Sequence, residues 1–317
     1  MPFTISDYIT CSIQIISLIA YLLVIFLLIS SIYHKTAGIS TEFYIHFVAN
    51  GVVDILSNVL DICIRRFLTW GCFLEFYHSY LWIGTISPIV YYSTMGNCAV
   101  GILIITLNRF LQMNFPLFYK SFWNKKVTII MIFFQIITPY ISYIYLVNFK
   151  VTLVYSEERD YFYHSMKDQK ASWLNSLVMC IWSGSTFIIS FVMNILNIRK
   201  YKEIMDKKKK SGSPTSKVYV YSFYCCIIST SLLMVFINSS IKLYAVEFAN
   251  KSLKELANFN FEWIILLMTC SHPFLIIILS RDIREKLLKF YTLNQLSKIR
   301  VIPMYVAVVT KSNVARH

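Results

Sequence analysis

Charged side chains are scarce in this sequence, and long stretches contain none. Only 15% of the 317 residues are charged, whereas a soluble domain usually carries about 25%. A stretch of roughly 18 or more apolar residues can cross the ~30 Å hydrocarbon core of a bilayer as a helix. A backbone in lipid must satisfy its own hydrogen bonds, which favours helices. The scarcity of charge therefore argues against a soluble domain and predicts membrane helices.

Seven stretches are long and apolar enough to be such helices. We place six of them at about residues 9–32, 43–64, 127–149, 171–198, 218–241 and 261–280, and the third span within 75–109, where no charged residue intervenes. The residues before the first span lack the basic region of a cleavable signal peptide, so we expect that span to be retained. The expected fold is all-α: a seven-transmembrane helix bundle over residues 1–280.

Metal-binding and catalytic patterns are also missing. The eight cysteines include no Cys-x-x-Cys pair and no Cys/His cluster at metal-ligand spacing. Asp54, Asp61 and His272 lie in apolar spans, but no nucleophile or metal-ligand pattern surrounds them. We therefore expect no metal, no cofactor and no enzymatic activity.

Basic residues are distributed unevenly between the two sets of connecting segments. The segments after the first, third, fifth and seventh spans hold 21 of the 30 Lys and Arg, and the opposite segments hold nine. The positive-inside rule places the first set in the cytoplasm and the N-terminus outside. The net charge of +14 is then a property of the inner membrane face, and we expect no nucleic-acid partner.

Polar residues recur along one face of the second span. Asn50, Asp54, Asn58 and Asp61 follow one another every three or four residues, so they share a helix face. An acid inside a bilayer costs a few kcal/mol on insertion scales and needs a partner, a proton or a water-filled cavity. This face is expected to point into the bundle.

Asp54 and His272 are expected at the same depth in the membrane. Asp54 and His272 each lie eleven residues after the start of their spans, Phe43 and Phe261, which enter from opposite sides. Both are therefore ~16 Å deep at 1.5 Å per residue. We hypothesise that they pair directly or through water. The alternative, that each satisfies a local backbone or Asn partner, stays open.

Asn97 lies at a similar level in the third span. It precedes Arg109 by twelve residues, which is ~18 Å along a helix. A buried Asn usually forms hydrogen bonds between helices, and we favour that role over contact with a ligand.

The inner end of the third span carries a spaced motif. Residues 107–110 read Leu-Asn-Arg-Phe and residues 116–119 read Pro-Leu-Phe-Tyr. This resembles rhodopsin-like receptors, which carry Asp-Arg-Tyr followed by Pro-Leu-x-Tyr at the same spacing. A lone Arg at a helix end is usually an interfacial anchor, but the shared spacing favours a receptor. The resemblance implies a G-protein-coupling face that includes Asn108, Arg109, Pro116, Tyr119 and Arg281.

The end of the seventh span carries a second motif. Residues 272–284 resemble the Asn-Pro-x-x-Tyr segment of the same superfamily and the short helix 8 that follows it, with His272 in place of Asn and Ile276 in place of Tyr. Farther on, Ile283, Leu287 and Tyr291 fall on one helical face, as in a helix that lies on a membrane surface. We therefore expect an amphipathic helix 8 and a cytoplasmic tail over residues 281–317.

Among such receptors, the sequence resembles most the nematode serpentine chemoreceptors of class gamma, with class V as a near rival. The features that carry the resemblance are the two motif segments, residues 122–126 (Phe-Trp-Asn-Lys-Lys), and the start of the second span, Phe-Tyr-Ile-His-Phe, with Asp54. The resemblance implies a plasma-membrane receptor in the sensory cilia of chemosensory neurons. It would bind an external small-molecule cue and signal to a heterotrimeric G protein. A ligand-gated channel or a transporter is the alternative, and a homo- or hetero-oligomer stays open.

The ligand pocket is expected between the outer halves of the third, fifth, sixth and seventh spans, as pockets between bundle helices are. Candidate lining residues are Tyr91, Tyr92, Met95, Trp182 and Ser183. Aromatic residues at helical spacing more often belong to a core, so these candidates compete with a packing role.

Two covalent features are weighed for the outer face. Asn250-Lys251-Ser252 is an N-glycosylation triplet. Rhodopsin-like receptors often tie the third span to the second outer loop by a disulfide, but residues 148–170 contain no Cys to pair with Cys72. Cys11 and Cys63 are the alternative partners, and a free thiol is the other alternative.

Overall fold

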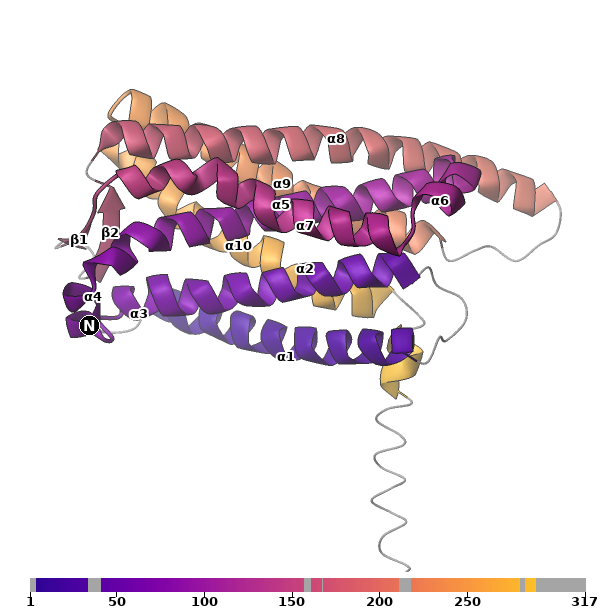
Figure 1. Cartoon of the computed structure of the whole chain (residues 1–317), viewed down its shortest axis with the longest axis horizontal. Coiled ribbons are helices and arrows are strands. Elements are labelled where there is room, and N and C mark those ends of the chain that lie inside the picture. Colours follow the sequence, from indigo (N-terminus) through magenta and orange to yellow (C-terminus); the bar gives the residue numbers. More distant parts are fainter. Residues whose placement is uncertain are drawn as a thin grey trace, which may run out of the picture.

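The computed structural model describes residues 4–33, 41–156, 161–166, 168–210, 218–279 and 283–288. Within them, seven helical segments are long and apolar enough to cross a membrane, which confirms the expected fold class. The long helices lie side by side in Figure 1. They are α1 (Ile5–Tyr33), α2 (Thr41–Leu60), α5 (Leu81–Asn114), α7 (Lys125–Tyr143), α8 (Gln169–Lys210), α9 (Val218–Glu247) and α10 (Lys251–Leu279).

Shorter elements lie at the two ends of this bundle. One end, here called the hairpin end, carries α3 (Phe67–Thr69), α4 (Leu74–Ser79) and the strands β1 (Val151–Ser156) and β2 (Tyr161–Met166). The opposite end, here called the α6 end, carries α6 (Pro116–Phe122). The second span continues beyond α2 as a π-helix, η1 (Asp61–Arg66), and a 3-10 segment, η2 (Ile144–Asn148), follows α7.

The bundle is apolar on its outside and polar within. Ile15, Ile19 and Phe26 of α1 are more than half exposed, as are Ile130 and Phe133 of α7. Such a surface suits hydrocarbon rather than water. Buried polar residues line the interior instead, and α5 is the most enclosed span, with 72% of its apolar stretch buried against 22% for α7.

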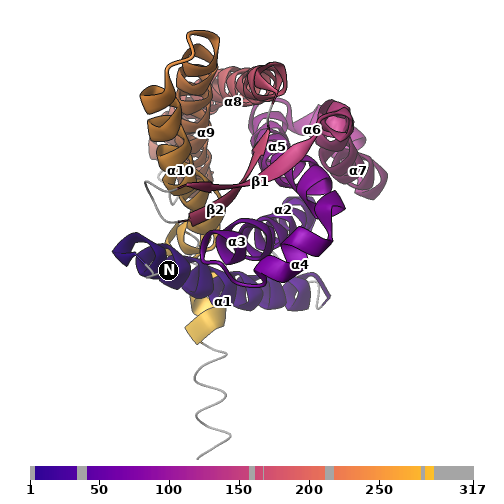
Figure 2. The ribbon, with the colours of Figure 1, turned by 90° about the vertical axis from the view of Figure 1, so that its left-hand side faces the viewer.

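The strands were not predicted. Residues 151–156 pair antiparallel with residues 161–166, from Val151 opposite Met166 to Ser156 opposite Tyr161. The hairpin lies across the end of the bundle in Figure 2, in contact with α3, α5 and α8. Two short strands satisfy each other's backbone groups, which allows this loop to fold over the helix ends without a disulfide.

Some helix ends also differ from the expected ones. The fifth span was expected to end near residue 198, but α8 continues to Lys210. The charged residues after residue 198 mark the end of the membrane-crossing part. They do not end the helix, because charged pairs also stabilise a helix in water. Glu203 lies 2.9 Å from both Lys200 and Lys207, one helical turn to either side, and such pairs support an exposed helix.

Residues 283–288 are helical and lie against the α6 end of the bundle. Ile283 is 2% exposed within the main core cluster. Arg284 donates to the carbonyl of Ile278, and the ammonium group of Lys286 lies 2.6 Å from the hydroxyl of Ser31. Arg281, Tyr291 and the remainder of the expected cytoplasmic tail lie outside the described residues.

Candidate functional site

Asp54 of α2 lies at the centre of the bundle with 1% of its surface exposed. Nδ1 of His272 in α10 lies 3.4 Å from Asp54 Oδ2, so the structure brings together the two residues that the depth argument placed at one level. The hydroxyl of Tyr21 in α1 lies 2.5 Å from the same oxygen, and Cys98 of α5 donates to Oδ1 at 3.1 Å. One carboxyl group thus connects four helices.

A second polar contact joins α2, α5 and α7 one turn away. Nε2 of Gln135 donates to Oδ1 of Asn50 at 2.6 Å and to the carbonyl of Asn97 at 3.2 Å. The Asn97 carboxamide, with its nitrogen turned toward α7, reaches the carbonyl of Gln135 at 2.8 Å. These contacts support the role of Asn97 between helices. Sequence reasoning did not single out Gln135.

Gly101 makes room for this contact. A Cβ atom at position 101 would lie 1.7 Å from Asn50 Oδ1 and 2.5 Å from Gln135 Nε2. No side chain fits there unless the hydrogen bond between Asn50 and Gln135 is broken. The glycine is therefore required by close approach rather than by backbone conformation.

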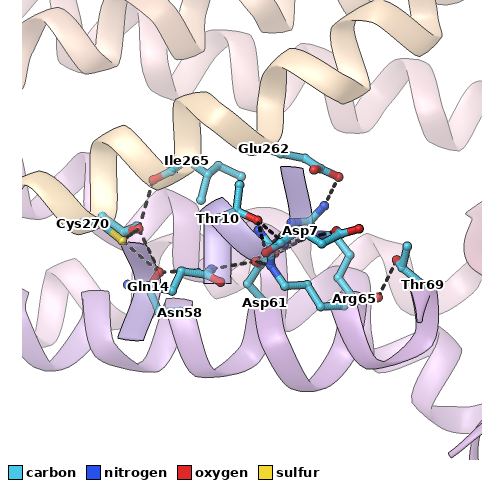
Figure 3. A network of polar contacts seen from close by, with 12 residues as sticks. Asp7, Thr10, Gln14, Asn58, Asp61, Arg65, Thr69, Glu262, Ile265 and Cys270 are labelled. Atoms are coloured by element: carbon cyan, nitrogen blue, oxygen red, sulfur yellow. Dashed lines mark hydrogen bonds and ion pairs between the residues drawn. The ribbon is translucent and has the colours of Figure 1, made fainter. Parts of the chain in front are cut away.

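The hairpin end holds an ion-pair network around Asp61 (Figure 3). Asp61 lies 2.6 Å from Arg65 and 3.1 Å from Arg66, and it accepts from Gln14 at 2.9 Å. Arg65 also pairs with Glu262 of α10. Charge-assisted hydrogen bonds of this kind are the stronger ones in proteins, and here they link α1, α2 and α10.

The π-helix η1 explains how one aspartate pairs with two successive arginines. Its backbone bonds run from residue i to residue i+5, so the side chains four and five positions after Asp61 both lie on its flank. Arg66 is 3% exposed on the bundle side and reaches the hydroxyl of Thr10 at 2.7 Å and Asp7 at 3.8 Å. Residues 61–64 were expected to end an α-helix, and neither the π-helix nor the roles of Arg65 and Arg66 were predicted.

Asn58 connects the network at the hairpin end to the central cluster. Its Nδ2 donates to the carbonyl of Asp54 at 2.9 Å, and its Oδ1 accepts from the hydroxyl of Thr269 at 3.3 Å. Figure 3 shows Asn58 lying between Gln14 and Cys270. The expected polar face of the second span therefore points into the bundle along its whole length.

The spaced motif of the third span folds into one unit at the α6 end. Nδ2 of Asn108 lies 3.3 Å from the hydroxyl of Tyr119, because Pro116 starts α6 in the orientation that returns Tyr119 to α5. The Tyr119 ring stacks on Trp123 at 5.9 Å between centroids. Arg109 is 9% exposed, and its Nη1 donates to Gln112 at 2.7 Å.

Two amide contacts tie the neighbouring helices to this end of α5. Nδ2 of Asn114 donates to Asn197 of α8 at 3.0 Å, and Nδ2 of Asn194 donates to Ser229 of α9 at 2.9 Å. The parts of α5, α8 and α9 near the α6 end are thus connected by polar contacts.

A cleft of about 250 Å³, which includes space open to solvent, lies between α5, α8, α9 and α10. It is lined by Tyr92, Asn175, Ser176, Met179, Asn238, Ser239, Lys242 and Phe261. The spans match those expected for a pocket. Among the predicted lining residues, Tyr92 lines this cleft.

The other four predicted pocket residues lie elsewhere in the packing. Met95 is 2% exposed in the main core cluster, against which Tyr91 and Trp182 pack. The hydroxyl of Ser183 donates to the carbonyl of Met179 at 2.7 Å. These four residues do not line this cleft, and their contact with a ligand stays a prediction.

The outer-face features are the cysteines considered for a disulfide and the glycosylation triplet at Asn250. Cys11, Cys63 and Cys72 are all free thiols, so neither alternative disulfide is present. Oδ1 of Asn250 accepts from the backbone of Leu253 at 3.0 Å and caps α10. Its glycosylation stays a prediction. Within the described residues, no three His, Cys, Asp or Glu side chains gather to hold a metal ion.

Comparisons with known proteins agree with this architecture. The profile of the family "Serpentine type 7TM GPCR chemoreceptor Srv" matches residues 10–293. The curated protein "Serpentine receptor class V-1" of Caenorhabditis elegans is 24% identical over 135 residues, which cover 42% of this chain and only 42% of that relative. Both matches are to class V, the rival left open above, and neither supports class gamma.

The family is one of receptors rather than of enzymes, and it does not favour a channel or a transporter. The match extends over all seven membrane-crossing helices. This chain therefore belongs to the Srv family of serpentine seven-transmembrane chemoreceptors.

Proposed function

We propose that the protein is a G-protein-coupled chemosensory receptor of the plasma membrane, with its hairpin end outside and its α6 end in the cytoplasm. A small molecule binds near the hairpin end, and a heterotrimeric G protein binds at the α6 end. The family supports this function. The orientation is supported by the basic residues, since 21 of the 30 lie in segments that follow the first, third, fifth and seventh spans, and those spans end at the α6 end.

The observation that carries the coupling role is the arrangement at the end of α5. Arg109 lies at the inner end of the most enclosed helix, and Asn108 beside it is bound to Tyr119 of α6. Around it, α8 extends beyond the bundle with Arg199, Lys200 and Lys202 (Figure 1). A cationic surface of this kind suits an acidic partner.

The helix α5 also supplies the route between the two ends. Tyr92 lines the cleft, and Arg109 lies seventeen residues farther along the same helix, about 25 Å at 1.5 Å per residue. Between them, Cys98 contacts Asp54 and Gly101 adjoins Asn50. A ligand that shifts α5 therefore also acts on the polar contacts that join it to α2 and α7.

The decisive experiment replaces Arg109 by Ala in cells that report G-protein signalling through calcium. We expect Arg109→Ala to abolish signalling, both basal and ligand-induced, while surface expression stays within about twofold of wild type. Lys125→Ala is the matched control, because Lys125 is an exposed basic residue near the same end. Full signalling by Arg109→Ala would contradict the proposed coupling mechanism.

Orientation has its own test. A glycan on Asn250, detected as a mobility shift that Asn250→Gln removes, would place the start of α10 outside. Antibody access to an N-terminal tag on intact cells gives a second readout of the same orientation. We also propose that the receptor lies in the sensory cilia of chemosensory neurons, where a fluorescent fusion would be seen at the ciliary membrane.

A further inference from the structure

Among the residues that the structure describes, the cleft at the hairpin end contains a cation that forms no ion pair. Lys242 of α9 is half-buried and lines the cleft, and it forms no ion pair within the part of the chain that the structure describes. Lys254 of α10, also half-buried, lies near enough for its charge to interact with that of Lys242. Glu262, the residue after Phe261 of the cleft, is paired with Arg65.

Snorkelling alone does not account for this lysine. A lysine near a helix end usually extends its ammonium group into water along apolar surface. Here the side chain instead lines a cleft next to a second lysine, and like charges in partly dry surroundings repel each other. The repulsion between the two lysines destabilises the empty cleft. A bound anion would reduce this repulsion and stabilise the complex.

A second observation points to a ligand in the same cleft. Asn175 of α8 is 3% exposed and lines the cleft, yet its carboxamide makes no hydrogen bond to any residue that the structure describes. Buried amides are nearly always hydrogen-bonded, and leaving one without a partner costs free energy. The buried Oδ1 needs a hydrogen-bond donor, and Nδ2, which donates to no described residue, can donate to an acceptor on a ligand.

We propose that this cleft binds a small organic acid, with its carboxylate on the ammonium group of Lys242 and within reach of the carboxamide of Asn175. This inference rests on the proposed receptor function, whose ligand class it names. Amines are disfavoured by the two lysines, and a neutral ligand leaves Lys242 desolvated without compensation. A carboxylate pairs with the charge of Lys242 and can accept from Nδ2 of Asn175, whereas the buried Oδ1 of Asn175 needs a donor such as a hydroxyl group.

The rest of the cleft sets the size and character of the acid. Tyr92, Met179 and Phe261 supply apolar surface on three sides, while Ser176 and Ser239 add hydroxyl groups. The volume of about 250 Å³ includes open solvent, so the enclosed part of the cleft holds only a small group of a ligand. A short aliphatic or phenyl-substituted acid fits better than a peptide or a lipid.

The test uses sets of compounds with a shared carbon skeleton. Aliphatic and phenyl-substituted carboxylic acids of three to ten carbons are compared with their primary amides, alcohols and amines at pH 7.4. Cells expressing the full-length receptor report calcium. We expect responses to acids only. Lys242→Gln should raise the half-maximal concentration about 10- to 100-fold, as expected for a hydrogen bond to a charged group, whereas Lys242→Arg should largely restore the response.

Two further variants separate the site from general effects. Asn175→Leu should raise the half-maximal concentration by a smaller factor, about 5- to 10-fold. Lys150→Gln should change nothing, because Lys150 is an exposed basic residue at the same end that does not line the cleft. Activation by amides or amines that survives Lys242→Gln would overturn the proposal.

Thermal unfolding of the purified receptor keeps the proposal testable without signalling. Lys242→Gln and Asn175→Leu should unfold at or above the wild-type temperature, because each removes an uncompensated polar group. A fall of several degrees would show that these residues serve the fold and would overturn the assignment. Acids that raise the unfolding temperature only when Lys242 is present, yet give no signal, would uphold the site and contradict the receptor function. Silence of every acid in both assays overturns the site.

Discussion

Asp54 and Asp61 lie two turns apart on one face of the second span, and both are almost fully buried, yet the bundle satisfies them in opposite ways. Asp61 is surrounded by charge, with Arg65 and Arg66 on its own helix and Glu262 beyond them. Asp54 contacts Tyr21, Cys98 and His272. Among these neighbours, only the histidine can carry a positive charge.

The difference follows from depth. At the hairpin end, Arg65 pairs with Asp61 while it is 27% exposed, and the 3% exposed Arg66 has Asp61, Asp7 and Thr10 as partners. At mid-membrane, a permanent cation is unfavourable, because the free energy of desolvating two charges can exceed the free energy gained by their attraction. Neutral donors and a titratable histidine satisfy Asp54 with a smaller desolvation penalty. One network therefore holds helices together, whereas the other is suited to rearrange.

The largest expected effect comes from the same substitution made at both aspartates. Asp61→Asn leaves Arg66, which is 3% exposed, without its nearest carboxylate, and the loss of one partner of a buried ion pair costs about 3–5 kcal/mol. We expect poor surface expression and a marked fall in thermal stability. Asp54→Asn keeps one of the two oxygens that accept from Tyr21 and Cys98 and places a neutral NH2 group at the other, so it should cost about 1 kcal/mol. Unfolding of both purified variants measures the contrast.

Two controls sharpen this pair. Arg66→Met in the Asp61→Asn background removes the unpaired cation and should recover much of the lost stability. Asp7→Asn should have a small effect, because Asp7 is 20% exposed and 3.8 Å from Arg66. Equal losses for Asp54→Asn and Asp61→Asn would show that the two carboxylates are not held in different ways.

The next effect concerns the contact beside the central cluster. Gly101→Ala places a methyl group against Asn50 and Gln135, and overpacking of this kind costs about 1–3 kcal/mol. We expect lower stability and altered basal signalling, since the contact joins α2, α5 and α7. Gly51→Ala is the matched control, because its nearest neighbour is the flexible end of Ile25 at 3.0 Å. Similar losses for both glycines would argue against a special role for the Asn50–Gln135 contact.

The contrast between the two networks also shows what could be predicted from the sequence. The shared level of Asp54 and His272 follows from residue counting, because the rise of an α-helix is constant. The same counting fails three residues past Asn58. Nothing in residues 61–66 marks a π-helix, whose register is decided by how Arg65 and Arg66 reach Asp61.

The cleft was harder to predict than the bundle. Lys242 is one of several lysines near a helix end. Whether a carboxylate reaches it can be seen only in the folded structure. Gln135 is a single amide in an apolar stretch, and its partner Asn50 lies 85 residues away. Apolar and polar residues alternate too weakly along residues 151–166 for the hairpin to be distinguished from a loop. Tertiary contact, rather than local pattern, decides each of these features.

The smallest expected effect extends the comparison to the α6 end, where a neutral contact stands next to Arg109. Tyr119→Phe removes the hydroxyl that Asn108 contacts at 3.3 Å and leaves a fully buried amide without that partner, at a cost of about 1 kcal/mol. The ring, and its stacking on Trp123, is retained. If this contact holds α6 on α5 in the inactive receptor, basal calcium signalling should rise severalfold while surface expression changes little. Tyr80→Phe, at the hairpin end, should leave basal signalling unchanged. A Tyr119→Phe receptor with wild-type basal signalling but reduced stability would assign the hydroxyl to packing alone.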